Sequence, residues 1–197
     1  MRNPALFDGE VVLLSALRLD GADLVGVANV VRFRTFMYWR TLRPTPHARH
    51  VFAHAMPVSA DGALIAIRMA PRTVNAGRIY FAAGTVEPQD FRDGQVDLEH
   101  NMAREVMEET GLDIAVLRRD PAYVLFASDT GTVLARRYYL DFTADEAVAR
   151  IERFVRHEAE PEITGPVVIR SPRDRPDSLM PHMPPLIDWH FAHPPHT

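Results

Sequence analysis

Residues 97–112, DLEHNMAREVMEETGL, are the stretch from which the fold is predicted. Asp97 is of a type that caps helix N-termini, because its carboxylate accepts hydrogen bonds from free backbone N–H groups. Gly111 is of the type that ends helices, because glycine adopts the left-handed conformation at little cost. Three apolar residues between them recur at the spacing of one helix face: Leu98, Met102 and Val106. The stretch therefore predicts an amphipathic helix over 97–110.

A second face of this helix carries Glu105, Glu108 and Glu109, three and four residues apart. Each like-charge pair at that spacing destabilises a helix by about 0.2–0.5 kcal/mol. Arg104, four residues before Glu108, relieves part of the repulsion, and a divalent cation would relieve more. Carboxylates without Cys or His among them favour Mg²⁺ or Mn²⁺ over zinc. The alternative is a solvated acidic face that binds nothing.

The stretch at 104–112, REVMEETGL, matches the second half of the Nudix signature, which reads Arg-Glu-aliphatic-any-Glu-Glu-any-Gly-aliphatic. The chain therefore resembles the Nudix hydrolase family. In the family's signature a Gly lies fourteen residues before the Arg, whereas Gly84 lies twenty before Arg104, so six residues look inserted. Val96 occupies the position of the family's upstream Glu. Three acidic residues are candidates to replace that Glu: Glu87, Asp97 and Glu99.

The resemblance implies an α+β fold, an α-β-α sandwich with a mixed β-sheet, over about residues 48–170. It also implies hydrolysis of a nucleoside diphosphate linked to another moiety, with Mg²⁺ or Mn²⁺ bound. The implied metal ligands are Glu105, Glu108, Glu109 and the backbone of Ala83. Arg104 then orients a carboxylate, Gly84 allows a close backbone approach, and Arg78 is a candidate phosphate contact. The candidate general bases are Glu109, Glu158, Glu160 and Glu162, and the alternative for the last three is a solvated acidic turn.

The composition bounds the class of protein. The chain has 197 residues, of which 47% are hydrophobic, so one domain with a sizeable core is expected. The net charge of −4 gives no basic field for nucleic acid, and no apolar run reaches the roughly 18 residues that cross a bilayer. The absence of cysteine excludes disulfides, thiolate zinc sites and a Cys nucleophile. We expect a cytoplasmic enzyme acting on a small molecule; the alternative is a non-catalytic nucleotide-binding module.

The rest of the chain is predicted as strands and helices around this helix. Apolar and alternating runs predict strands at 10–19, 51–58, 63–69, 78–83, 113–119, 123–128, 132–142 and 167–170. Helical spacing predicts further helices at 144–157 and 186–191, and a loop is expected over 85–96. The single domain is divided into an extension at 1–47, a core at 48–170 and a Pro-rich tail at 171–197.

Residues 22–41 have two interpretations. Several of their valines have helical spacing, but aromatic residues crowd 33–39 and alternate with Arg32, Arg34 and Arg40. Such a patch stacks a base and holds phosphates. Alternatively, it packs an N-terminal subdomain or forms a dimer interface, which makes a homodimer a candidate assembly.

Overall fold

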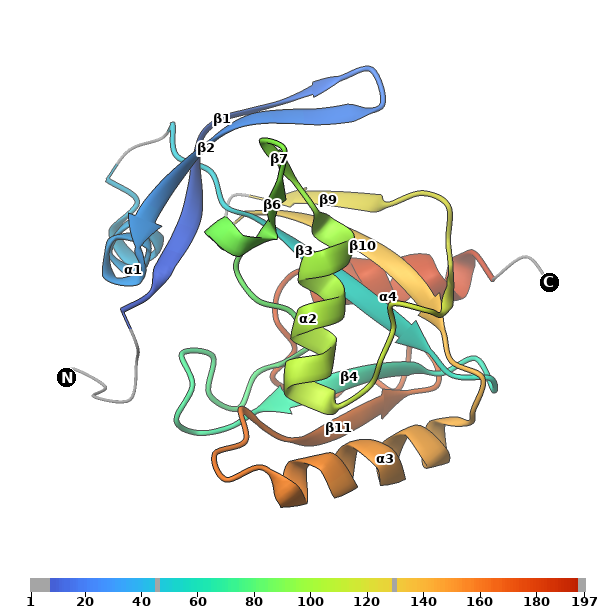
Figure 1. Ribbon diagram of the computed structural model, residues 1–197. Coiled ribbons are helices and arrows are strands. Elements are labelled where there is room, and N and C mark those ends of the chain that lie inside the picture. The colour runs from blue at the N-terminus through green and yellow to red at the C-terminus, as the bar shows by residue number, and fades with distance from the viewer. Residues whose placement is uncertain (1–7, 45–46, 129–130, 195–197) are drawn as a thin grey trace.

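The computed structural model describes residues 8–44, 47–128 and 131–194. Within these ranges one mixed sheet contains β3 Val51–Val58, β4 Leu64–Met69, β5 Ile79–Tyr80, β8 Arg118–Arg119, β9 Val124–Ser128, β10 Gly131–Tyr139 and β11 Ile163–Ile169. The strand order is β11-β4-β3-β10-β8, with β5 beside β4 and β9 beside β10 (Figure 1). β3 and β10 are parallel, and the other pairs are antiparallel. The predicted mixed sheet is confirmed.

Helices cover both faces of this sheet. α2 Leu98–Thr110 and α3 Ala144–His157 lie over one face, and α4 Met183–Ala192 lies over the other (Figure 1). Neighbouring side chains of β10 point to opposite sides, as expected for a strand. Arg136 donates to Glu99 of α2, whereas Arg137 donates to the carbonyl of His193 after α4. The fold is therefore the predicted α-β-α sandwich.

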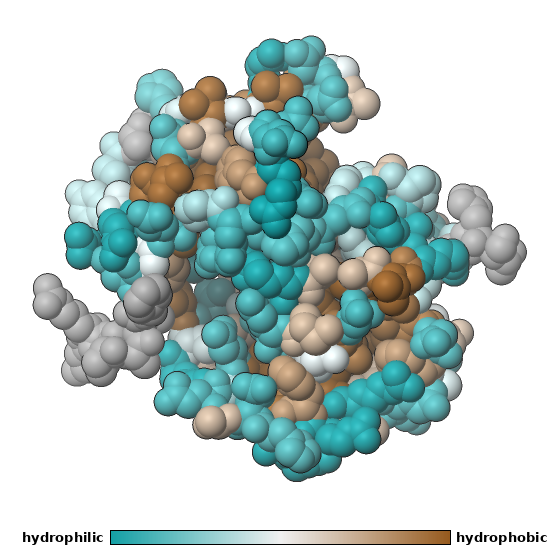
Figure 2. Space-filling view, in the orientation of Figure 1, coloured by the Kyte–Doolittle hydropathy of each residue, from teal (hydrophilic) through white to brown (hydrophobic). Residues whose placement is uncertain are grey.

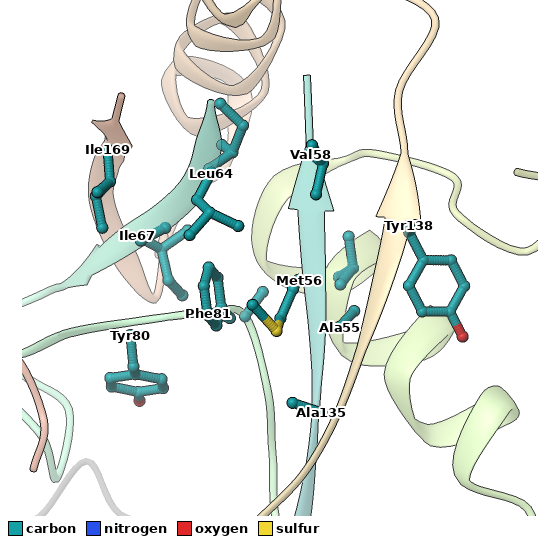
Figure 3. Close-up of a cluster of buried hydrophobic side chains, with 14 of the residues drawn as sticks. Ala55, Met56, Val58, Leu64, Ile67, Tyr80, Phe81, Ala135, Tyr138 and Ile169 are labelled. Atoms are coloured by element: carbon teal, nitrogen blue, oxygen red, sulfur yellow. The ribbon is translucent and has the colours of Figure 1, made fainter. Parts of the chain in front are cut away.

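Apolar side chains fill the space between the sheet and the helices (Figure 3). Met56, Leu64 and Phe81 are almost fully buried there. Because β3 and β4 are covered on both faces, their sequences are apolar nearly throughout rather than alternating. Met183 of α4 is buried in the same cluster, so part of the predicted tail stabilises the sheet. The division into extension, core and tail stays a prediction.

α2 forms where the sequence predicts a helix. The side chain of Asp97 accepts from the backbone N–H of His100 at 2.9 Å, and Gly111 ends the helix with a φ of 70°. A Cβ at Gly111 would also overlap the ring of Phe154 on α3, so glycine permits the close packing of the two helices. The two ends therefore fix α2 both along its axis and against α3.

The N-terminal segment is not helical where the spacing of its valines is helical. β1 Glu10–Asp20 and β2 Asp23–Arg32 form an antiparallel hairpin, and α1 Phe33–Leu42 follows. The valine-rich part of 22–41 is a strand because β1 pairs with it along its whole length and satisfies its backbone. Phe36 and Trp39 are buried with Val11 in a second, smaller cluster. Part of the aromatic patch thus packs an N-terminal subdomain, as the second interpretation states.

Residues 85–96 are also more regular than the expected loop. They contain a 3-10 turn, η1 Pro88–Asp90, and a short hairpin made of β6 Phe91–Arg92 and β7 Gln95–Val96. Other predicted boundaries shift: β5 and β8 are shorter than predicted, β11 begins at Ile163, and α4 extends beyond 186–191 at both ends. The outer ends of the predicted extension and tail, 1–7 and 195–197, lie outside the described residues.

None of the helices at 8–44, 47–128 or 131–194 is long and apolar enough to cross a bilayer.

Candidate active site

A cavity of about 690 Å³ lies between α1, α2 and the loops that follow β4 and α3. The wall formed by α2 and the segment after β5 contains most of the predicted site: Ala83, Gly84, Arg104, Glu105, Glu108 and Glu109. Of the other predicted residues, Glu160 lines the cavity, whereas Arg78 and Glu158 do not. A cavity of this size accommodates a ligand as large as a nucleotide.

Glu105 packs directly against the backbone at Gly84. Glu105 is only 8% exposed. A Cβ at position 84 would lie well inside 3.0 Å of all three heavy atoms of the Glu105 carboxyl group. Gly84 has no positive φ, so the close approach of the carboxyl group, and not the backbone conformation, requires glycine there. The backbone approach predicted for Gly84 is therefore an approach to Glu105.

Glu109 lies one turn further along α2 and is buried beside the same segment. Its carboxylate accepts the backbone N–H of Ala83 at 3.1 Å. Burial raises the pKa of Glu109 well above its usual value, and the neighbouring Glu105 raises it further. Burial likewise raises the pKa of Glu105 to about 8, although the charge of Arg104 opposes this shift. Two adjacent buried carboxylates therefore lack enough positive charge to ionise fully at neutral pH.

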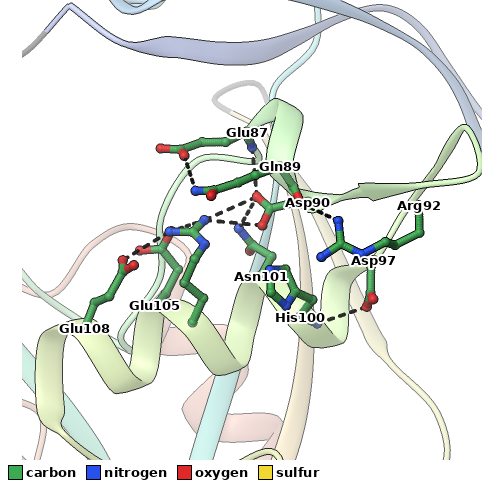
Figure 4. A network of polar contacts seen from close by, with 10 residues as sticks. Glu87, Gln89, Asp90, Arg92, Asp97, His100, Asn101, Glu105 and Glu108 are labelled. Atoms are coloured by element: carbon green, nitrogen blue, oxygen red, sulfur yellow. Dashed lines mark hydrogen bonds and ion pairs between the residues drawn. The ribbon is translucent and has the colours of Figure 1, made fainter.

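Arg104 is the cation shared by three acidic side chains, Asp90, Glu105 and Glu108, and Figure 4 labels these three acids. Its guanidinium contacts Glu105 at 2.8 Å, Glu108 at 3.1 Å and Asp90 at 3.2 Å. The Arg104 side chain is itself largely buried. Because a buried charge is stable only when it is paired and hydrogen-bonded, these contacts hold Arg104 against Glu105.

Asp90 is the residue of this network that the sequence analysis missed. Asp90 is fully buried, and it accepts from the Asn101 side chain and from the backbone N–H of Glu87, each at 2.9 Å. It lies six residues after Gly84, which is the spacing of Gly and upstream Glu in the Nudix signature. Counting forward from Gly84, rather than back from Arg104, would have found it. Asp90 thus takes the position of the upstream Glu.

The six inserted residues are then 91–96, FRDGQV, which form β6 and β7. Asp93 and Gly94 have φ of 50° and 78°, as in the type I′ turn of a two-residue hairpin. The backbone N–H of Asp97 donates to the carbonyl of Asp90 at 2.7 Å and closes the base of the hairpin. The insertion therefore leaves Asp90 beside the start of α2. Figure 2 shows a hydrophilic surface over this hairpin and α2.

The three candidates for the upstream Glu have other positions. Glu87 lines the cavity. Asp97 caps α2, and Glu99 forms ion pairs with Arg119 at 2.7 Å and with Arg136 at 2.6 Å. Asp97 and Glu99 are therefore structural residues at the start of α2 and do not line the cavity.

The acidic residues of α2 fit a hard divalent cation by their chemistry. As positioned, no three acidic or histidine side chains among residues 8–44, 47–128 and 131–194 form a group that could hold one metal ion. Arg104 and the N–H of Ala83 occupy the carboxylate oxygens instead. All the donors are nevertheless carboxylates, and two of them are buried without sufficient positive charge. A cation bound at the other oxygens, Oε2 of Glu105 and Oε1 of Glu109, would supply that charge while Arg104 stays in place.

Comparison with known proteins adds to this geometry. No protein-family model matches the sequence, and no curated protein matches it. Among solved structures, the MutT protein from Methanosarcina mazei is 19% identical, with a TM-score of 0.51 over 73% of this chain and 94% of the other. The DR0079 protein from Deinococcus radiodurans is 15% identical, with a TM-score of 0.56 over 92% of this chain and 99% of the other.

A MutT Nudix hydrolase from Burkholderia pseudomallei is 17% identical and has a lower TM-score of 0.45, over 71% of this chain and 96% of the other. The likeness to the first two structures is a likeness of fold, spanning nearly the whole of both of them. The sheet topology, the acidic face of α2 and the similarity of fold to the solved Nudix structures give one conclusion. This chain has the Nudix fold.

Proposed function

We propose that this protein is a metal-dependent hydrolase that cleaves the diphosphate of a nucleoside diphosphate linked to another moiety. The observation that carries the proposal is the pair of buried carboxylates, Glu105 and Glu109, in the wall of a cavity of about 690 Å³. Burying two neighbouring acids is costly unless a cation binds them. A non-catalytic nucleotide-binding module is the alternative, and nothing in the network around Arg104 favours it.

In this proposal Glu105, Glu108 and Glu109, with the carbonyl of Ala83, hold Mg²⁺ or Mn²⁺. When bound, such a cation neutralises phosphate oxygens and lowers the pKa of a water molecule. Glu105 and Glu109 hold their positions because the backbone at Gly84 and Ala83 packs against them. Carboxylates on a rigid helix meet the geometric tolerance that such a site needs.

Arg104 and Asp90 are positioning residues. Asp90 is fixed by two hydrogen bonds from the chain, and it holds the guanidinium of Arg104 at 3.2 Å. Arg104 in turn contacts the carboxyl group of Glu105 at 2.8 Å. The line from Asp90 through Arg104 therefore sets the orientation of Glu105, as supporting residues do around metal ligands.

The general base is best assigned to Glu162. Of the candidates after α3, Glu158 does not line the cavity, and Glu160 is paired with Arg72 at 2.8 Å. Glu162 and Glu109 line the same cavity. A carboxylate in that position can take a proton from an attacking water without being a ligand of the cation.

The test is a panel of nucleoside diphosphate compounds with Mg²⁺ or Mn²⁺, scored for phosphate-containing products. We expect turnover by the wild type, and a loss in Glu109→Gln larger than the roughly tenfold to hundredfold cost of removing a residue that only supports a metal ligand. Glu152→Gln, an exposed change on α3, is the matched control. Nucleotide binding without turnover of any compound would instead support the non-catalytic module.

We also propose a homodimer that uses the β1–β2 hairpin. The turn end of this hairpin projects away from the sandwich (Figure 1), although the start of β1 is hydrogen-bonded to Arg49 and Val86. Several apolar residues of the hairpin are exposed: Leu19, Val25, Val27 and Val30. A two-stranded hairpin is only marginally stable alone, and exposed apolar residues on it mark an interaction surface. The cytoplasmic location stays a prediction.

A further inference from the structure

A second part of the cavity lining comes from α1 and the segment after it. α1 and the segment after it contribute Phe33, Phe36, Arg40, Arg43 and His50 to the lining. The two walls of one cavity therefore have opposite charge: carboxylates on α2 and guanidinium groups on and just after α1. The proposed diphosphate chemistry uses the first wall and leaves the second unexplained.

Arg40 is the central residue of this second wall. Its guanidinium donates to the side chain of Asn75 at 2.9 Å, and Arg40 forms no ion pair with any acid in residues 8–44, 47–128 and 131–194. Burial lowers the pKa of Arg40, and the nearby charge of Arg43 lowers it further. Arg40 therefore keeps a half-buried positive charge that no carboxylate of the described chain neutralises.

Arg43 strengthens the positive charge of this wall. It follows α1 with a φ of 47°, and its guanidinium lies over the ring of Trp39 at 4.0 Å. Stacking on an aromatic face fixes the plane of the Arg43 guanidinium and keeps its positive charge beside Arg40. Two like charges are thus held at one end of the cavity, where an anion would be attracted by both.

His50 adds a neutral polar group beside these arginines. Its ring packs between Phe36 and Phe52, with centroid distances of 4.7 and 4.8 Å. Burial, together with the smaller effects of the Arg40 and Arg43 charges, lowers the pKa of His50 to about 3, so the ring is neutral at neutral pH. Among the residues that the structure describes, none forms a hydrogen bond with the buried Nε2 atom of His50. Buried polar atoms are rarely left unpaired, so this nitrogen marks a place where a ligand atom is expected.

Two hydrogen bonds lead from Arg40 through Asn75 to Tyr80 along the cavity lining. Asn75, which accepts from Arg40, donates to the hydroxyl of Tyr80 at 3.2 Å. Glu109 raises the pKa of Tyr80, after the larger effect of burial, so Tyr80 lies near the acidic wall. Arg40, Asn75 and Tyr80 all line the cavity, and they connect the cationic end to the carboxylates.

We propose that Arg40, with Arg43 and the free nitrogen of His50, binds a second anionic group of the substrate, remote from the diphosphate. A phosphate monoester and a carboxylate both match a guanidinium in shape and charge. This inference rests on the proposed function, because the acidic wall and its cations must hold the diphosphate. The substrates it selects are diphosphate compounds that carry another negative charge.

The first test measures anion binding without metal or hydrolysis. Full-length wild type, Arg40→Gln, Arg40→Lys and Arg34→Gln are titrated with inorganic phosphate by calorimetry. Arg34 is the matched control, since it lies on the same helix, pairs with Asp8 at 2.9 Å and does not line the cavity. We expect Arg40→Gln to weaken binding by at least about tenfold, Arg40→Lys to weaken it less, and Arg34→Gln to bind as the wild type does. Equal binding by Arg40→Gln, or no binding by the wild type, would overturn the proposal.

The second test identifies the anion with matched substrates. UDP-glucose is compared with UDP-glucuronate, which adds a carboxylate, and NAD with NADP, which adds a phosphate monoester. We expect the charged member of one pair to have the lower KM, and Arg40→Gln to raise KM for that member alone with kcat little changed. Equal KM values within both pairs would contradict the selectivity. Absence of turnover with all four compounds would count against the proposed function, and the phosphate titration would still decide the role of Arg40.

Discussion

Substituting alanine for Gly84 tests how the site positions its acids, because the change adds one methyl group and removes no charge. That methyl group would lie well inside 3.0 Å of the carboxyl carbon and both oxygens of Glu105. Glu105 cannot simply turn away, since it is 8% exposed and its carboxyl group is held by Arg104 at 2.8 Å. Either the carboxyl group or the backbone at residue 84 must therefore move.

The expected magnitude follows from that overlap. Forcing one extra methyl group into a packed site costs about 1–3 kcal/mol of unfolding free energy. A displacement of about 1 Å in a group that orients the reaction costs about a hundredfold in rate. We expect Gly84→Ala to lose stability modestly and turnover strongly, with the affinity for Mn²⁺ reduced.

The assay is a double-mutant cycle with Glu105→Asp, whose shorter side chain withdraws the carboxyl group from residue 84. Urea unfolding of the metal-free protein is measured for the wild type, both single variants and the double variant. If the overlap is the cause, the double variant should be more stable than the sum of the single effects predicts, by about 1 kcal/mol or more. Effects that add within about 0.5 kcal/mol would refute the reasoning.

Three further predictions follow from the same contacts. Asp90→Asn should lower the unfolding free energy by about 3 kcal/mol, because it removes the fully buried carboxylate that pairs with Arg104. A loss below about 1 kcal/mol in urea unfolding would contradict this. The pKa of Glu105 is about 8 in the folded state and near 4.5 in the unfolded state, so its protonation favours the folded state. This contribution to stability is fully present below pH 4.5 and is lost as the pH rises through 8. The metal-free Tm should therefore fall between pH 5 and pH 8, Mg²⁺ should raise Tm more at pH 8 than at pH 5, and Glu105→Gln should reduce both effects. Light scattering should give the mass of a dimer for the wild type and of a monomer for Val27→Lys, since Val27 is 56% exposed on the β1–β2 hairpin; a monomeric wild type would remove the proposed dimer.

The sequence predicts α2 and its acidic face well because the signals are local. Asp97 and Gly111 specify the helix ends, and the glutamate spacing alone specifies one helix side. The alternation between apolar runs and turns likewise predicts β3, β4 and α3 almost to their observed bounds. Such local rules predict the helices and strands that position the site, but not the residues that other segments contribute to it.

The parts that were missed depend on register or on distant contacts. Asp90 is hidden because six residues, 91–96, separate it from α2 and fold back as a hairpin whose Asp93-Gly94 turn was a usable signal. β2 is a strand because it pairs with β1, although its valines have helical spacing. Arg40 lines the same cavity as the acids of α2 because the extension packs beside the sandwich. No residue spacing within 22–41 reveals this packing.

The central claim is that the acidic residues of α2 hold divalent cations, and Mn²⁺ bound in crystals of the full chain tests it most directly. Anomalous difference maps should show Mn²⁺ within coordination distance of Glu105 and Glu109, with Glu108 drawn in and Arg104 still in contact with Glu105. Crystals of Glu109→Gln grown and soaked in the same way should lose that density. Ions found only on other acidic residues, or none beside α2 at saturating Mn²⁺, would contradict the account.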